Sequence, residues 1–339
     1  MIKHLPDNCS AIYSDLLQKI EDSPFVALAG GAFVSKEIQG TRYWYYQTRS
    51  LGKQVQKYLG KESAQLLTLI GEAKSAREKA GAILDERRRL VAMLLVSGAT
   101  PEKGRPAKVL AKLSDAGLFS GGGALVGSFA FACYGNMLGV SLKASLSRTE
   151  DMDFSVEREL EIGLSRNLQK DISEIEPALE TPRQINPWLP PFEMKTPDGF
   201  KIEFLTAKRG THDKAPVLIE RFGIHAQPLD YMDYLLDGTQ LAVVLNGAGI
   251  PVKVPEPARF ALHKLAVSQL RPTGHQGKTT KDIAQAGCLI EILSEDNPGA
   301  LLLALEAASA RDDGMLELVR KGAARLPEAI GILLKRITH

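Results

Sequence analysis

The sequence predicts an α+β fold, in which a small mixed sheet lies between an N-terminal hairpin and helical region and a C-terminal helical domain. Apolar and polar residues alternate at 151–156 and 200–205, which is the period of a strand with one buried face. Aromatic and β-branched residues between glycines at 40–60 are typical of a hairpin. Helical patterns occupy 62–97 and the chain from residue 251 onward. Strands and helices are thus both present and mixed along the chain.

The composition is that of an ordinary globular protein. The chain has 339 residues, of which 44% are hydrophobic and 24% are charged, so it can bury a sizeable core. Its 42 basic and 40 acidic residues argue neither for nor against a nucleic-acid partner. No apolar run is long enough for a membrane span, and the first ten residues are polar. We therefore expect no membrane partner and a cytoplasmic location.

The first region, residues 1–118, begins with a predicted helix at 9–21, followed by the hairpin and the long helix. Arginine stands beside four aromatic residues at 42–46. These side chains could stack on nucleic-acid bases, or they could pack on a helix or on the second subunit of a homodimer. Both interpretations stay open. The run of Arg87, Arg88 and Arg89 is expected to be a solvated helix face.

The second and third regions are predicted to span residues 119–248 and 249–339. The second has candidate strands at 121–126 and 240–245 besides the two alternating runs, and a helix at 128–138. The third is predicted to be all-helical from residue 251. Its helices are expected at 255–270, 280–293, 300–308 and 315–336.

Two acids stand two positions apart on one predicted strand. Residues i and i+2 of a strand point to the same face, so Asp151 and Asp153 lie side by side. Such carboxylates repel each other unless a cation lies between them, and hard oxygen ligands suit Mg²⁺. Glu203 is the middle acid of the second alternating strand. It could complete a metal site, or it could face solvent on the polar side of the sheet.

Upstream of these acids lies a glycine-rich turn that ends in Gly127 and Ser128, directly before a predicted helix. Glycine lets the backbone approach a ligand closely, and the first N–H groups of a helix favour anions. A simple turn with a helix cap would have the same sequence. The order of phosphate cradle and carboxylate cluster indicates phosphoryl or nucleotidyl transfer.

The motif around Gly127 and Ser128, then Asp151 and Asp153, then Glu203 resembles the polymerase β-like nucleotidyltransferase superfamily, including prokaryotic toxin-like and uncharacterised members. That superfamily has Gly-Ser, then Asp-x-Asp on the next strand, then a third acid on a later strand. The resemblance covers residues 121–205 and extends loosely through the helices up to residue 293. The interval between Ser128 and Asp151 is longer than usual, which we ascribe to a loop at 139–148 and which puts the strand pairing in question.

The resemblance implies a role for each matching residue. Asp151, Asp153 and Glu203 would hold two Mg²⁺ ions with a nucleoside triphosphate, and Glu203 would also help to deprotonate the acceptor hydroxyl. Gly127 and Ser128 would hold the β- and γ-phosphates. Related lysines contact the triphosphate, which makes Lys264 and Lys278 candidates, although solvated helix lysines are the alternative.

The implied reaction moves a nucleoside monophosphate to a hydroxyl of an RNA 3′ end, a protein or a small molecule, with release of pyrophosphate. A different metal enzyme with an Asp-x-Asp motif, such as a nuclease or a glycosyltransferase, is one alternative. A non-catalytic module that binds nucleotides or nucleic acid is the other. The large N-terminal region suggests a macromolecular acceptor or a dimer.

Overall fold

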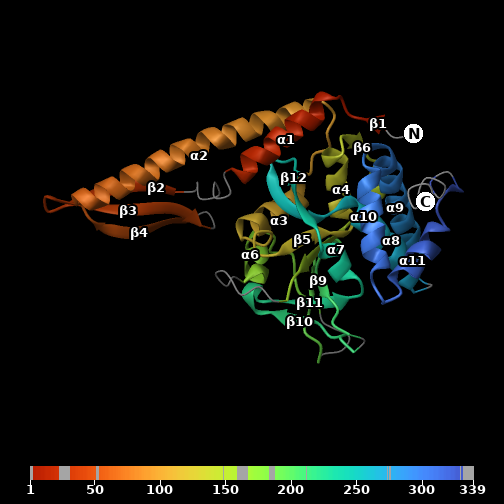
Figure 1. Ribbon diagram of the computed structural model, residues 1–339. Helices are drawn as coiled ribbons and strands as arrows, with labels where there is room; N and C mark the ends of the chain where they lie inside the picture. The colour runs from red at the N-terminus through yellow and green to blue at the C-terminus, as the bar shows by residue number, and fades with distance from the viewer. Residues whose placement is uncertain are drawn as a thin grey trace.

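The computed structural model describes residues 3–22, 31–50, 53–147, 149–158, 167–182, 188–210, 212–272, 274, 276–328 and 330. Figure 1 shows a rounded body and a long arm that projects from it. The C-terminal helices cover one side of the body, and the arm projects from the opposite side. The mixture of helices and strands confirms the predicted α+β class.

The arm consists of a three-stranded antiparallel sheet and the first part of a long helix. Its strands are β2 (Gly31–Ile38), β3 (Thr41–Ser50) and β4 (Lys53–Lys61), in the order β2-β3-β4. We call these three strands the arm sheet. The turn between β2 and β3 has two residues, Gln39 and Gly40, with φ of 50° and 72°, as a tight hairpin with the right twist requires. The predicted hairpin is confirmed and gains a third strand, β2.

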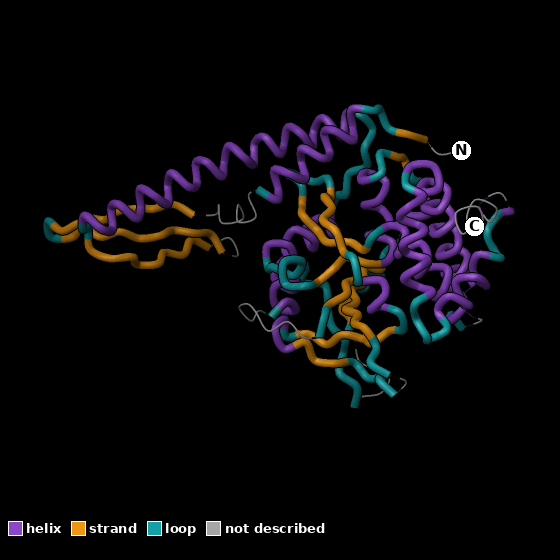
Figure 2. Tube along the Cα trace, in the orientation of Figure 1, coloured by secondary structure: helices purple, strands orange, loops and turns teal. Residues whose placement is uncertain are grey.

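The long helix α2 (Ala64–Val96) connects the arm sheet to the body. Ser63 caps it by accepting a hydrogen bond from the N–H of Leu66 at 3.2 Å. With 33 residues, α2 is about 50 Å long. Figure 2 shows this helix running alongside the arm sheet and on to the top of the body. The predicted helix at 62–97 is thereby confirmed.

The body end of α2 is held by packing and by one buried arginine. Residues of α1 (Asn8–Glu21), including Tyr13 and Leu16, form a small hydrophobic cluster with Leu90 and Leu94 of α2. Arg87 donates hydrogen bonds to the carbonyl oxygens of Ala248 and Gly249, at 2.9 and 2.7 Å. The interpretation of a solvated face was therefore wrong for Arg87, which is buried because it ties the helix to a turn of the body, and right for Arg88 and Arg89, which are exposed.

We call the sheet of the body the body sheet. Among the described residues it has six strands, of which five lie in the order β10-β11-β9-β7-β5, and the sixth, β8, also pairs with β9. Antiparallel pairing joins β5 to β7, whereas β7, β9 and β11 are mutually parallel, so the sheet is mixed as predicted. Its strands are β5 (Gly123–Val126), β7 (Asp151–Val156), β8 (Glu193–Lys195), β9 (Lys201–Ala207), β10 (Val217–Ile219) and β11 (Ile224–Leu229).

Smaller elements surround this sheet. They are β1 (Lys3–His4), α3 (Gly104–Asp115), α4 (Gly127–Met137), β6 (Val140–Ser141), α5 (Ala144–Ser147), α6 (Leu168–Ile175), η1 (Glu220–Phe222), α7 (Met232–Leu236), β12 (Thr239–Val244) and β13 (Ile250–Pro255). β12 and β13 form an antiparallel pair. The all-helical prediction from residue 251 was wrong here, because the alternating Val252 and Val254 are buried on one side of a strand.

The remaining C-terminal part is helical as predicted. Its helices are α8 (Pro257–Leu270), α9 (Gln276–Asp296), α10 (Pro298–Ser309) and α11 (Met315–Ala323). The predicted last helix extended to residue 336, but α11 ends at Ala323, and residues 331–339 lie outside the described residues. One hydrophobic core runs from Ala107 to Leu326 and joins these helices to the body sheet. The division at residues 118 and 248 stays a prediction.

Within the described residues, no helix combines the length and the apolar character that crossing a membrane would require.

Candidate active site

The predicted acids lie on the open face of the body sheet. Burial alternates residue by residue along β9 and over residues 151–154 of β7. Met152 and Ile202 are fully buried in the core, whereas Asp151, Asp153 and Glu203 point the other way and are partly exposed. The same alternation that forms the strands therefore places all three predicted acids on one face.

The strand register brings the acids of different strands into a row. Asp153 of β7 lies opposite Glu203 of β9, and Glu203 lies opposite Glu193 of β8. Directly opposite residues of neighbouring strands lie on the same face within contact distance. Asp153, Glu203 and Glu193 thus form an acidic row across three strands. Glu193 was not predicted, because its short strand has only the faint alternation of Glu193-Met194-Lys195.

This crowding changes the ionisation of the acids. Burial, and then the facing carboxylate of Glu203, raise the pKa of Asp153 to about 7. Burial also raises the pKa of Glu193, and Glu203 adds to that rise. The acidic row consequently resists carrying its full negative charge unless cations stand beside it.

Two lysines provide such charge. Lys201 Nζ lies 2.8 Å from Glu203 Oε1 and 3.8 Å from Asp151 Oδ1. Lys278 Nζ, from the start of α9, lies 3.2 Å from Asp151 Oδ2. The structure thus brings the predicted Lys278 to the acids and adds Lys201, which sequence reasoning missed. Lys201 stands two positions before Glu203 on an alternating strand, and this pattern also fits a lysine that faces solvent. The sequence therefore did not single out Lys201 as a site residue.

Lys264 is also close to the site but is engaged elsewhere. Its Nζ lies 2.6 Å from Asp282 Oδ1, and both side chains are buried. Arg271 Nε contacts the other oxygen of Asp282 at 2.5 Å. Lys264 therefore links α8 to α9, and its charge helps to lower the pKa of Asp153 against the stronger effects of burial and Glu203.

The acids fit a divalent cation in the chemistry of their donors. Carboxylate oxygens are the hard ligands that Mg²⁺ prefers, and a cation beside Asp153 and Glu203 would offset burial and the charge of Glu203, which together raise the pKa of Asp153. Among the described residues, no three His, Cys, Asp or Glu side chains are already gathered so that they could hold one ion. Before they could bind a cation, the side chains of Asp151 and Glu203 would have to turn away from Lys201 and Lys278.

Gly127 lies against the acidic row. It follows β5, whose last residue Val126 pairs with Asp153, and it has φ of +64°. A Cβ at this position would overlap Asp153 Oδ2. Only glycine combines this backbone conformation with room for the carboxylate. The first residue of α4 therefore packs directly against the Asp153 side chain.

Ser128 is held by a glutamine of the C-terminal helices. Gln285 Nε2, in α9, donates to Ser128 Oγ at 3.2 Å and to the carbonyl oxygen of Leu146 at 2.7 Å. Gln285 is fully buried, and its Oε1 has no hydrogen-bond partner among the described residues. Gln285 was not predicted, because a polar residue inside a long helix does not indicate which neighbour it meets.

The long interval between Ser128 and Asp151 contains structure of its own. β6 pairs with β1, and the short helix α5 contacts both α4 and α9. The direct pairing of β5 with β7 resolves the question about strand pairing that this interval raised. The insertion therefore lies beside the site and leaves the order of the motifs intact.

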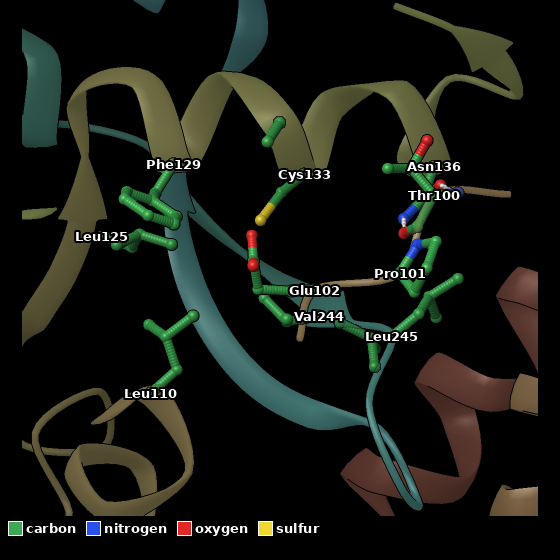
Figure 3. Close-up of a pocket in the computed structure, with 12 residues that line it drawn as sticks. Thr100, Pro101, Glu102, Leu110, Leu125, Phe129, Cys133, Asn136, Val244 and Leu245 are labelled. Atoms are coloured by element: carbon green, nitrogen blue, oxygen red, sulfur yellow. Dashed lines mark hydrogen bonds between the residues drawn. The ribbon is translucent and has the colours of Figure 1, made fainter. Parts of the chain in front are cut away.

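A cavity behind α4 is too small for a nucleotide. Figure 3 shows Glu102 pointing toward Cys133 in this cavity, between Phe129 and Thr100. Its volume is about 30 Å³, room for about one water molecule. Burial, and then the charge of Glu102, raise the pKa of Cys133 to about 12. This thiol is therefore a packing residue.

Comparison with known proteins gives one match. A family model described as nucleotidyltransferase matches residues 105–310. No curated protein and no solved structure matches the chain. The matched segment covers more than half of the 339 residues and contains Gly127, Ser128 and all three predicted acids, whereas the arm lies outside it. The protein belongs to the nucleotidyltransferase family and is an enzyme of nucleotidyl transfer.

Proposed function

We propose that this enzyme transfers a nucleoside monophosphate from a nucleoside triphosphate to a hydroxyl acceptor and releases pyrophosphate. The observation that carries the proposal is the register of Asp153 opposite Glu203, with the backbone of Gly127 against the Asp153 carboxylate. Acids on two parallel strands beside a helix N-terminus bring anion-binding N–H groups and carboxylates to one place.

The proposal assigns the acids to two Mg²⁺ ions held by Asp151, Asp153 and Glu203. When bound, these ions would neutralise charge on the attacking and leaving oxygens. Glu203, which is partly exposed, accepts the proton of the acceptor hydroxyl. To hold a cation, the Glu203 carboxylate would have to release Lys201, with which it forms an ion pair at 2.8 Å.

The triphosphate is held from the other side of the site. Gly127, Ser128 and the first N–H groups of α4 bind its β- and γ-phosphates. The Lys278 side chain is 56% exposed, so it can turn from Asp151 to the triphosphate. Lys264 stays with Asp282 and acts on the site through its charge, because both groups are buried.

The acceptor is an RNA 3′ end, a protein side chain or a small molecule. The arm extends away from the body, outside the segment that matches the family. A macromolecular acceptor, or a second copy of the chain, would have a use for such an extension, whereas a small molecule would not.

The test is transfer of label from each α-labelled nucleoside triphosphate, with Mg²⁺, to the RNA, protein and small-molecule fractions of a cell extract. Label should enter one fraction with equimolar release of pyrophosphate, and Asp153→Asn should abolish both. Asp312→Asn, which changes an exposed acid of the body, is the matched control and should leave transfer unchanged. Label that enters a fraction equally with Asp153→Asn would sink the proposal.

A further inference from the structure

One face of the arm sheet carries a cluster of tyrosines. Tyr45 pairs with Tyr58 across β3 and β4, and Tyr43 pairs with Lys36 and Lys61 on its two sides. Paired residues lie on the same face, and so do residues two apart. The ring centroids of Tyr43 and Tyr45 lie 6.3 and 5.5 Å from that of Tyr58. We call this side of the sheet the tyrosine face.

The opposite face of the sheet is turned toward α2. Trp44, which points that way, donates from Nε1 to Glu62 Oε2 at 2.9 Å. Lys74 of α2 lies over the Trp44 ring, 5.8 Å from its centroid. The tyrosine face is therefore turned away from the helix. On this face, Tyr58 is 55% exposed to solvent.

The polar groups of the tyrosine face are arranged around its rings. Lys36 Nζ lies 4.9 Å from the Tyr45 ring centroid and donates to Gln56 Oε1 at 2.7 Å. Gln56 in turn donates to Gln47 Oε1 at 2.7 Å. A partner would therefore meet flat aromatic rings, an ammonium group and amide hydrogen-bonding groups at one surface.

The charge of the arm sheet indicates a polyanion. Residues 31–62 contain six lysines and arginines and two glutamates, whereas the whole chain is nearly balanced at 42 to 40. On the tyrosine face itself, Lys36 and Lys61 flank Tyr43. The two glutamates lie elsewhere, because Glu37 pairs with Arg42 on the face toward α2 and Glu62 accepts from Trp44. A second copy of this basic face would therefore repel the first. Rings that stack on bases, together with cations that hold phosphate, are the features that bind single-stranded nucleic acid without strong sequence preference.

We propose that the tyrosine face binds single-stranded RNA, with bases stacked on Tyr43, Tyr45 and Tyr58 and phosphates near Lys36 and Lys61. The phenol hydroxyls and the amides of Gln47 and Gln56 can bond the 2′-hydroxyl, which DNA lacks. This inference rests on the proposed function, because it selects RNA from the possible acceptors. The arm then holds the acceptor strand while its 3′ end reaches Glu203.

The experiment measures binding of a fluorescent 20-nucleotide unstructured RNA to the full-length protein by anisotropy, without nucleoside triphosphate. Each tyrosine-to-serine change should weaken binding about tenfold, and the combined Tyr43→Ser, Tyr45→Ser, Tyr58→Ser variant at least about 100-fold. Tyr45→Phe keeps the ring and should bind within about twofold of the unchanged protein. Lys36→Gln should reduce the salt slope of binding by roughly 0.7.

Trp188→Ser is the matched control, because it removes a 90% exposed aromatic ring that lies on the body instead of the arm. It should leave binding unchanged. Equal binding by the unchanged protein and the triple variant would overturn the inference, as would equal affinity for DNA of the same sequence. Self-association that the triple variant abolishes, without RNA binding, would assign the face to a second copy and overturn it too.

The binding assay and the transfer of label, measured on the same variants, separate this inference from the proposed function. Asp153→Asn should bind RNA as tightly as the unchanged protein, because the acidic row and the arm share no residue. Tyrosine-dependent RNA binding with no transfer of label to RNA would leave the arm's role standing and sink transfer to RNA. Transfer to RNA that the triple variant performs with an unchanged KM for RNA would overturn the arm's role and leave the chemistry standing.

Discussion

The arm sheet and the body sheet have similar alternating strands but differ in what covers them. In the body sheet, every second residue of β9 is buried, and Ile202 and Phe204 are 0% and 2% exposed. In the arm sheet, none of the residues whose side chains the structure describes is buried. Its rings instead contact each other and solvent, as Tyr45 and Tyr58 do.

The difference separates two ways of placing functional groups. Burial of one face makes the body sheet stable enough to hold the like charges of Asp153 and Glu203 side by side, although their repulsion opposes folding. The arm sheet has no such buried face among its described side chains, so its stability depends on cross-strand pairs and on contacts with α2. Changes at the acidic row of the body sheet should therefore alter mainly the chemistry, and changes on the tyrosine face of the arm sheet should alter mainly the binding of a partner.

The largest expected effect is that of Asp153→Asn in the body sheet. The turnover number should fall on the order of 10³-fold, because the amide is a poor ligand for a divalent cation. The melting temperature should stay the same or rise, because a neutral group no longer repels Glu203. Steady-state kinetics and thermal unfolding check both. A large fall in melting temperature would mean that Asp153 is a structural residue.

A smaller loss is expected for Gly127→Ala, which adds a Cβ where Asp153 Oδ2 lies. Activity should fall about 100-fold, and the free energy of unfolding by roughly 1–3 kcal/mol. Gly247→Ala is the matched control, with a similar φ of +59° and no atom within 4 Å of the new Cβ. It should lose about 1 kcal/mol of stability and keep its activity. Equal activity losses in both variants would refute a role for the contact with Asp153.

Where the arm meets the body, Arg87→Met should lower the free energy of unfolding by roughly 2 kcal/mol, because the buried carbonyl oxygen of Gly249 and the partly buried one of Ala248 lose their donor. Arg88→Met replaces the exposed neighbour, which pairs with Asp85. This variant should change the free energy of unfolding by less than about 0.5 kcal/mol. Urea unfolding followed by circular dichroism measures both. Similar values for the two variants would show that Arg87 does not anchor α2.

A small effect on stability is expected at the tyrosine face. Tyr58→Ser should change the free energy of unfolding by at most about 1 kcal/mol, because the side chain is exposed and contributes only a cross-strand contact. The same urea titration measures it. A loss above about 3 kcal/mol would make Tyr58 a structural residue and would remove the contrast between the two sheets.

Much of the fold and of the candidate site follows from local pattern. The period of two along β7 and β9 predicted both strands and put Asp151, Asp153 and Glu203 on one face. The spacing of glycines predicted the hairpin, and helical periodicity predicted α2 and the C-terminal helices. The order of Gly127, the two aspartates and Glu203 indicated the family that the comparison then showed.

Contacts between distant segments were decided only by the tertiary structure. Glu193 joins the acidic row through the register of β8, Gln285 meets Ser128 across 157 positions, and Arg87 meets Gly249 across 162. The local pattern around each of these residues, a short strand, a helix and a basic run, is compatible with several different contact partners. The sequence by itself therefore determined which residues share a face of an element. Packing determined which faces meet, because the partner of a side chain is selected by burial and by hydrogen bonds that form only once the chain has folded.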